Sequence, residues 1–136
     1  MTAFEKKFKL MTDMKDDEAS LRYIIHGVNI EKKDDKGMTF LHRAVLGNYH
    51  LIVRILLECG ADPQIQDNVG RNALHIAVLL AVKSNANNDM QIIELLLMLG
   101  ADHKISFSKL GMNVVEIAHN RRRPDLAAFI EKTAMA

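Results

Sequence analysis

Apolar residues recur along the chain at the three- and four-residue spacing of amphipathic helices. In segment 49–58 the apolar residues fall on one face of a helix. These residues are Ile52, Val53, Leu56 and Leu57. A second apolar run occupies residues 90–99, and shorter runs begin just after positions 39, 72 and 113. The pattern therefore predicts a chain built from paired helices.

Polar residues mark where these helices begin, and glycines mark where they end. Thr39, Asn72 and Asn113 each precede an apolar run. Their side-chain oxygens can accept a hydrogen bond from the first turn of backbone N–H groups, which is the role of a helix N-cap. Gly60 and Gly100 follow apolar runs, and glycine readily adopts the left-handed conformation that ends many helices. We therefore expect short helices separated by tight connections.

Two short motifs repeat in the same order along the chain. The glycines at 27 and 60 are 33 residues apart, as are those at 37 and 70. Segment 34–44 aligns with segment 67–77, and the Leu-Leu-x-x-Gly-Ala-Asp run at 56–62 recurs at 96–102. These residues resemble the ankyrin repeat, which has the same period and a Thr-Pro-Leu-His-x-Ala signature. Here the signature reads Thr-Phe-Leu-His-Arg-Ala from residue 39 and Asn-Ala-Leu-His-Ile-Ala from residue 72.

The resemblance implies an all-α repeat solenoid of helix-turn-helix units joined by hairpin-like loops. It covers residues 34–131 well, whereas residues 3–33 match only through a weaker ending at 23–29. We expect one ankyrin-repeat domain over residues 1–136. Its four repeats are an N-terminal cap at 1–33, repeats at 34–66 and 67–106, and a C-terminal cap at 107–136, with the register of the first repeat left open. Asn48 stands where the family usually has glycine, a mild departure because asparagine tolerates the left-handed conformation.

The third and fourth repeats depart further from the family pattern. Gly60 and Gly100 are 40 residues apart, and the surplus lies at 81–89. Its serine and asparagine content predicts a solvated loop after a one-turn extension of the first helix, with Asp89 capping the next helix. In the fourth repeat Glu116 replaces the motif histidine, and Pro124 begins the last helix. The role of the insertion is left open.

The first repeat is expected to contribute two amphipathic helices. Phe4, Phe8 and Met11 can form the apolar side of one helix. The apolar side of the second would be formed by Leu21, Ile24 and Ile25. We therefore expect this repeat to cover one end of the stack, because each repeat of a solenoid buries its apolar face against a neighbour.

Composition narrows the possible partners and locations. A chain of 136 residues fits one domain, and its formal net charge of +1 gives no general attraction to nucleic acid or an anionic membrane. The longest apolar stretch, residues 73–82, is about half the roughly 20 residues that a membrane-spanning helix needs. The first residues lack the apolar core of a secretory signal. We therefore expect an intracellular protein, cytoplasmic or nuclear, that is monomeric on its own.

Candidate catalytic and metal chemistry is sparse. The six histidines show no pair at metal-ligand spacing, and no phosphate-binding or nucleophile motif is present. His42 and His75 occupy the same motif position, where an imidazole would tie the adjacent hairpin by hydrogen bonds. An enzyme using Cys59 is kept only as a control hypothesis, because a thiolate is disfavoured at the end of a helix. We expect no enzymatic activity, no cofactor and no metal.

The resemblance also implies a binding surface. In the ankyrin family, partners usually contact a concave surface formed by hairpin tips and first helices. The corresponding residues here are Lys36, Met38, Leu46, Val69, Arg71, Leu79, Lys109 and Met112. Five of the eight are apolar, which predicts contact with the apolar side chains of a partner protein. The opposing interpretation is that these side chains fill gaps between adjacent hairpins.

We therefore interpret the chain as a non-enzymatic protein–protein interaction module with a partner of unknown identity. The alternative is an inhibitor or regulatory subunit of an enzyme, for example a kinase, or of a transcription factor. The repeats do not distinguish the two. A basic run at 121–123 is interpreted as a solvated loop of the C-terminal cap, because Asp125 follows it and no aromatic residues are interleaved.

Overall fold

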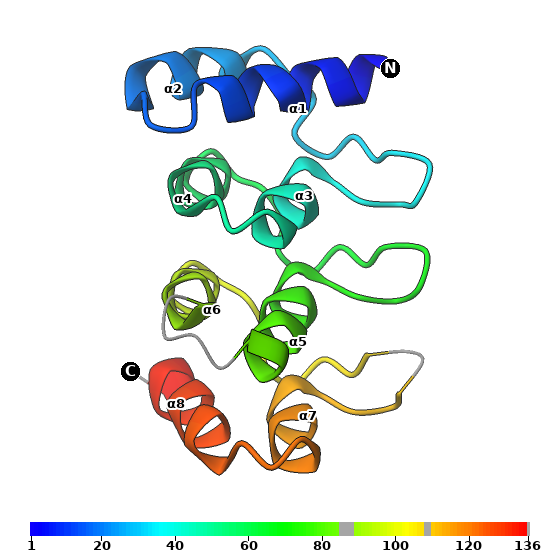
Figure 1. The fold of residues 1–136 in the computed structure, drawn as a ribbon, viewed down its shortest axis with the longest axis vertical. Helices are drawn as coiled ribbons and strands as arrows, with labels where there is room; N and C mark the ends of the chain where they lie inside the picture. Colours follow the sequence, from blue (N-terminus) through cyan, green and yellow to red (C-terminus); the bar gives the residue numbers. More distant parts are fainter. Residues whose placement is uncertain (85–88, 108–109, 136) are drawn as a thin grey trace.

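The computed structural model describes residues 1–84, 89–107 and 110–135, and the regular elements of this part are helices (Figure 1). They are arranged as four consecutive pairs. The bounds are α1 Ala3–Asp13, α2 Glu18–His26, α3 Phe40–Leu46, α4 His50–Glu58, α5 Ala73–Ser84, α6 Asp89–Met98, α7 Val114–Asn120 and α8 Pro124–Met135. The chain has the ankyrin repeat fold that the sequence predicts.

The helices form two layers, and the connecting loops project from one side (Figure 1). Helices α1, α3, α5 and α7 make up the first layer, and α2, α4, α6 and α8 make up the second. Within each layer, α3 contacts α5 and α5 contacts α7, while α2, α4, α6 and α8 contact one another in sequence. Each pair therefore buries its apolar face mainly against the next pair.

The first pair closes onto the second through aromatic and aliphatic contacts. The rings of Phe4 and Phe40 stack in parallel, with centroids 4.2 Å apart. Met11 and Leu21 are fully buried, and Phe8 is half-buried against the same core. These contacts confirm the apolar sides that the spacing predicted for both helices of the first repeat.

The predicted caps and turns are confirmed. The side chains of Thr39, Asn72 and Asn113 each accept a hydrogen bond from the backbone N–H three residues later, at 3.3, 2.9 and 3.0 Å. Gly60 and Gly100 have φ angles of 98° and 114°, in the left-handed region. Asn48 adopts φ 61° at the turn between α3 and α4, as its position in the motif implies.

The third pair contains the long connection. Helix α5 continues to Ser84, which confirms the expected extension of this helix. Residues 85–88 of the predicted loop lie outside the described residues. Helix α6 begins at Asp89 itself, one position earlier than expected, a shift of the size by which helix boundaries commonly differ.

No helix in the described part of the chain is long and apolar enough to span a bilayer.

Candidate partner-binding surface

A carboxylate organises the first hairpin. One oxygen of Asp34 accepts the backbone N–H groups of Lys36 and Met38, both at 2.9 Å. The other accepts two hydrogen bonds from the guanidinium of Arg43, at 2.8 and 2.6 Å. Burial raises the pKa of the Asp34 carboxyl, but the Met38 N–H and the Arg43 guanidinium outweigh this effect and hold the pKa below its ordinary range. These hydrogen bonds therefore fix the conformation of the turn.

The second hairpin has the same design, whereas the third is different. Asp67 accepts the backbone N–H groups of Val69 and Arg71 at 3.0 and 2.9 Å, and its second oxygen binds the Arg71 Nε at 2.9 Å. In the third hairpin the Phe107 N–H donates to the Met112 carbonyl, the backbone bond that Asp34 and Asp67 make in the first two, and the Phe107 ring stacks on that of His75 with centroids 5.6 Å apart. In both hairpins the side chain at this position is buried.

Two buried histidines link consecutive repeats. His42 joins α3 to the hairpin that follows α4, and His75 joins α5 to the hairpin that follows α6. His42 Nδ1 accepts the Thr39 backbone N–H at 3.1 Å, and its Nε2 donates to the Arg71 carbonyl at 2.9 Å. His75 Nδ1 accepts the N–H of the residue three before it, and its Nε2 donates to the Ile105 carbonyl at 2.9 Å. The structure therefore confirms the interpretation of both histidines as links between repeats. Burial lowers the pKa of both imidazoles.

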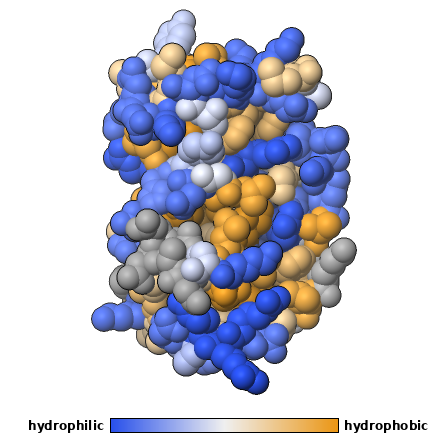
Figure 2. Space-filling view, viewed as in Figure 1, coloured by the Kyte–Doolittle hydropathy of each residue, from blue (hydrophilic) through white to orange (hydrophobic). Residues whose placement is uncertain are grey.

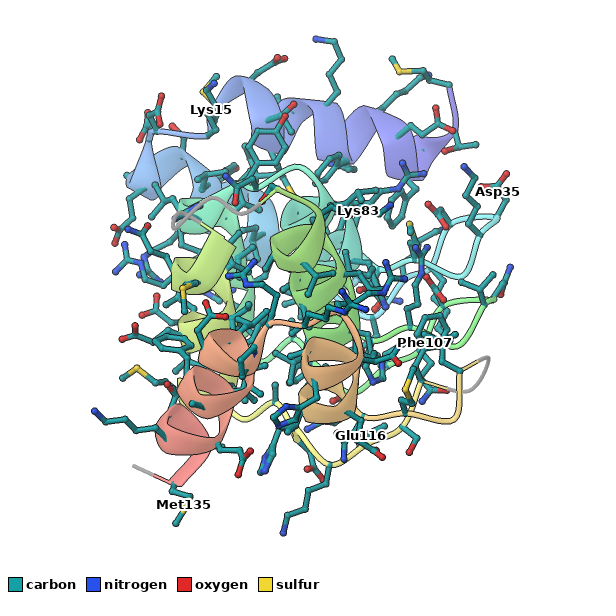
Figure 3. The ribbon with its side chains drawn as sticks, turned by 60° about the horizontal axis from the view of Figure 1, so that its bottom comes forward. Lys15, Asp35, Lys83, Phe107, Glu116 and Met135 are labelled. Atoms are coloured by element: carbon teal, nitrogen blue, oxygen red, sulfur yellow. The ribbon has the colours of Figure 1, made fainter. Side chains whose placement is uncertain are left out.

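Further hydrogen bonds connect one hairpin to the next. The Asn68 backbone N–H donates to the Lys36 carbonyl at 3.0 Å, and its side-chain amide donates to the Asp35 carbonyl at 3.1 Å. Asp35 lies at the tip of the first hairpin and Phe107 in the third, on the same side of the helices (Figure 3). The hairpins therefore form a row whose geometry is set by the chain itself.

Six of the eight predicted contact residues lie in accessible or half-buried positions. Lys36 is exposed and Leu46 is 44% exposed. The half-buried members are Val69, Arg71, Leu79 and Met112. We call Lys36, Leu46, Val69, Arg71, Leu79 and Met112 the concave surface. Figure 2 shows hydrophobic side chains gathered in the middle of the visible face, over α5, with hydrophilic side chains around them. Lys109 lies outside the described residues.

The expectation that Met38 offers an exposed contact is wrong. Its side chain is only 4% exposed and belongs to the hydrophobic core. The equivalent residue of the next hairpin, Arg71, is half-buried and pairs with Asp67 at 2.9 Å. Turning a flexible apolar methionine inward removes it from water and stabilises the fold, whereas a guanidinium must keep its contact with a carboxylate or with water. The same backbone position therefore holds a buried side chain in one hairpin and a half-buried one in the next.

The second-helix layer carries an apolar groove that the sequence analysis did not single out. The groove lies between α4 and α6, has a volume of about 430 Å³ and includes Leu51 and Leu95. Met98 borders it with 68% of its surface exposed. The signal in the sequence is weak, because these residues look like ordinary members of an apolar helical run until the two helices are placed side by side.

The other candidate residues occupy structural positions. Arg123 pairs with Asp125 at 3.0 Å and also donates to the Ala81 carbonyl at 3.2 Å, so part of the basic run holds the last pair against α5. Cys59 is half-buried at the end of α4. In the described part of the chain, His, Cys, Asp and Glu side chains form no group of three or more that could hold a metal ion.

Comparisons with known proteins agree with this architecture. A family model described as ankyrin repeats, in three copies, matches residues 10–106. The chain is 40% identical over 67 residues to an ankyrin repeat protein of Acanthamoeba polyphaga mimivirus, and 36% identical over 80 residues to one of fowlpox virus. These matches cover 49% and 59% of this chain but only 14% and 17% of the two viral proteins.

A solved structure supports the same assignment. The crystal structure of an ankyrin repeat domain from Acinetobacter baumannii superposes with a TM-score of 0.71 at 28% identity, covering 85% of this chain and 56% of that one. The fold and its hairpin surface define a helical repeat protein of the class that binds other molecules along an extended face. The chain belongs to the ankyrin repeat family, whose members are generally non-enzymatic modules for protein–protein interaction.

Proposed function

We propose that the chain is a non-enzymatic module that binds a partner protein through the concave surface. The observation that carries this proposal is the exposure of Leu46, which leaves 44% of a leucine in water at the end of α3. Leu79 is half-buried one repeat later, at the matching position of α5. Covering such apolar side chains is favourable, and clusters of them commonly mark protein interfaces.

The fixed hairpins support the same function. Their turns are held by Asp34 and Asp67, and their spacing is held by His42 and His75. A surface that is already ordered loses less conformational entropy on binding, so more of the contact free energy appears as affinity. Exposed Lys36 adds positive charge beside the apolar residues of the concave surface, which selects among partners more than it adds affinity.

The partner could be held passively or could be inhibited. In the alternative function, the same surface blocks an enzyme, for example a kinase, or a transcription factor. An activity assay of the captured partner separates the two: a scaffold leaves the activity unchanged, whereas an inhibitor lowers it in proportion to occupancy. We also propose that the chain is monomeric on its own and acts in the cytoplasm or nucleus. Sedimentation and imaging of the tagged protein test these points.

The binding surface is tested by a pair of matched substitutions. Leu46→Asp places a charge among the apolar residues of the concave surface, and Leu99→Asp makes the same change at a leucine outside this surface with nearly equal exposure, 44% against 42%. A partner captured by the wild-type chain is titrated with each variant after circular dichroism has shown both to be folded. We expect Leu46→Asp to weaken binding about tenfold or more and Leu99→Asp to leave it near the wild-type value. Equal affinities for the two variants would contradict the concave-surface proposal.

A further inference from the structure

A small cavity lies in the first repeat, between the start of α1 and the loop that follows α2. Its volume is about 240 Å³, and its lining includes Phe4, Lys7, Val28, Lys32 and Phe40. None of these residues belongs to the concave surface. A typical pocket for a drug-sized ligand has a volume of about 300–1,000 Å³, so this cavity is suited to something smaller, such as one apolar side chain.

The floor of the cavity is rigid and apolar. Phe4 and Phe40 are buried and stacked on each other with an interplanar angle of 1°. Val28 is half-buried and packs against the same core. Because the floor is built from side chains that join α1 to α3, it is held in place by the packing of the first two repeats.

The rim of the cavity is positively charged. Lys7 and Lys32 are both exposed, and the described residues that line this cavity include no carboxylate. The ion pairs found among the described residues do not involve either lysine. Two ammonium groups beside an apolar floor favour a ligand that combines carboxylates with an apolar group.

The neighbouring charges fix where those carboxylates would lie. An adjacent cavity shares Phe4 and Lys32 but is also lined by Asp34 and Asp35. The Asp34 carboxylate is neutralised by its bonds to Arg43, whereas Asp35 is exposed at the hairpin tip (Figure 3). Lys33 also lines that adjacent cavity, so the Asp35 end carries charges of both signs, whereas the Lys7 end carries positive charge alone.

We propose that this cavity is a second docking site, which takes an acidic segment of a partner protein. One apolar side chain of the segment enters the cavity against Val28 and the accessible edges of Phe4 and Phe40, and flanking carboxylates lie beside Lys7 and Lys32. Nucleic acid fits less well, because the formal net charge of +1 gives the chain no general attraction to a phosphate backbone. A free inorganic anion would make no use of the floor.

The site is tested with an array of short synthetic peptides of stated chemistry. Each peptide carries leucine, phenylalanine or serine at its centre, flanked by aspartate, lysine or serine. We expect the chain to retain peptides that pair an apolar centre with aspartate, and to lose this binding as the salt concentration rises from about 0.1 M to 1 M. Failure to bind any peptide, or equal binding of peptides with apolar and serine centres, would overturn the proposal.

Charge-reversal variants then locate the binding. The best peptide is labelled and titrated against the pair Lys7→Glu and Lys32→Glu, and against the control pair Lys6→Glu and Lys104→Glu, which changes the net charge equally at exposed lysines outside the cavity. The first pair should weaken binding about tenfold or more, and the control should stay close to wild type. Lys7→Gln with Lys32→Gln should give a smaller loss in the same direction. Equal losses in the two charge-reversed pairs would indicate nonspecific attraction and would overturn the assigned site.

Discussion

The first helices of the second and fourth repeats begin with the same reciprocal capping box. The residue three positions after the N-cap is a histidine in the second repeat and a glutamate in the fourth, and the two make different further contacts. In the second, the Thr39 side chain accepts the His42 N–H, and His42 Nδ1 accepts the Thr39 N–H. In the fourth, Asn113 and Glu116 exchange the equivalent two bonds. His42 is 1% exposed and also reaches the next hairpin, whereas Glu116 is exposed and its carboxylate bonds to the N-cap of its own helix.

This difference shows that the motif histidine has two separable roles, capping its own helix and linking that helix to the next repeat. Capping one helix needs only a side-chain acceptor, which imidazole and carboxylate both provide. Linking to the next repeat needs, in addition, a donor on the far side of the same ring, and Nε2 of a neutral imidazole supplies it. Glutamate is therefore sufficient at Glu116, while His42 and His75 serve both the helix and its neighbour.

Removing the His42 ring should produce the largest loss of stability. His42→Ala leaves the Arg71 carbonyl and the Thr39 N–H without their buried partners and also opens a cavity. We expect the free energy of unfolding to fall by about 2–4 kcal/mol, measured by urea denaturation. A loss no larger than that of Glu116→Ala would show that the link between repeats adds nothing.

Protonating the ring should produce a smaller effect in the same direction. Burial lowers the pKa of His42 and His75. The hydrogen bonds to the Arg71 and Ile105 carbonyls and the charge of Asp67 oppose this effect, and the positive charges of Arg71 and Lys33 reinforce it at His42. The unfolded chain, with a histidine pKa near 6.5, therefore takes up protons before the folded chain does. The contribution of the two rings to stability is complete above about pH 6.5 and is lost as the pH falls towards their folded pKa values.

Urea melts over a series of pH values check this dependence. His42→Gln should reduce the slope of unfolding free energy against pH, and Glu116→Ala should keep it. Stability that stays constant or rises as the pH falls below about 6.5 in the wild type would contradict the buried, neutral state of the two rings.

Asn72 offers a stabilising substitution at the same motif position as Thr39. Its oxygen caps α5, but its buried Nδ2 has no hydrogen-bond partner among the residues that the structure describes. Asn72→Thr keeps a cap oxygen and removes the unpaired donor, so the free energy of unfolding should rise by about 1 kcal/mol. Thermal melts provide the measurement. A lower melting temperature for Asn72→Thr would mean that the amide makes a contribution that the hydrogen bonds do not explain.

The exposed capping box should give the smallest effect. Glu116→Ala removes one of the two reciprocal bonds at the start of α7, while the Asn113 side chain can still accept its own bond. We expect a loss of roughly 0.5 kcal/mol in urea denaturation. A loss as large as that of His42→Ala would show that Glu116 has a further role in the fold.

The helices, caps and links could be predicted because they depend on residues close in sequence or one repeat apart. Thr39 and His42 are three residues apart, and the period of 33 places His42 and His75 in the same environment. The burial of Met38 could not be predicted in this way, since the period makes it equivalent to Arg71 and only the side chains differ. The groove beside Met98 depends on how α4 and α6 sit side by side, which no local pattern specifies.

The concave surface is tested most directly by methyl NMR spectra of the chain with and without its captured partner. The surface contains four residues that carry methyl groups, Leu46, Val69, Leu79 and Met112, and the second-helix groove offers Leu51, Leu95 and Met98 as internal controls. We predict that adding the partner shifts the four methyl-bearing residues of the concave surface and leaves the three controls unchanged. Shifts confined to Leu51, Leu95 and Met98 would contradict the account and would move the interface to the second-helix layer.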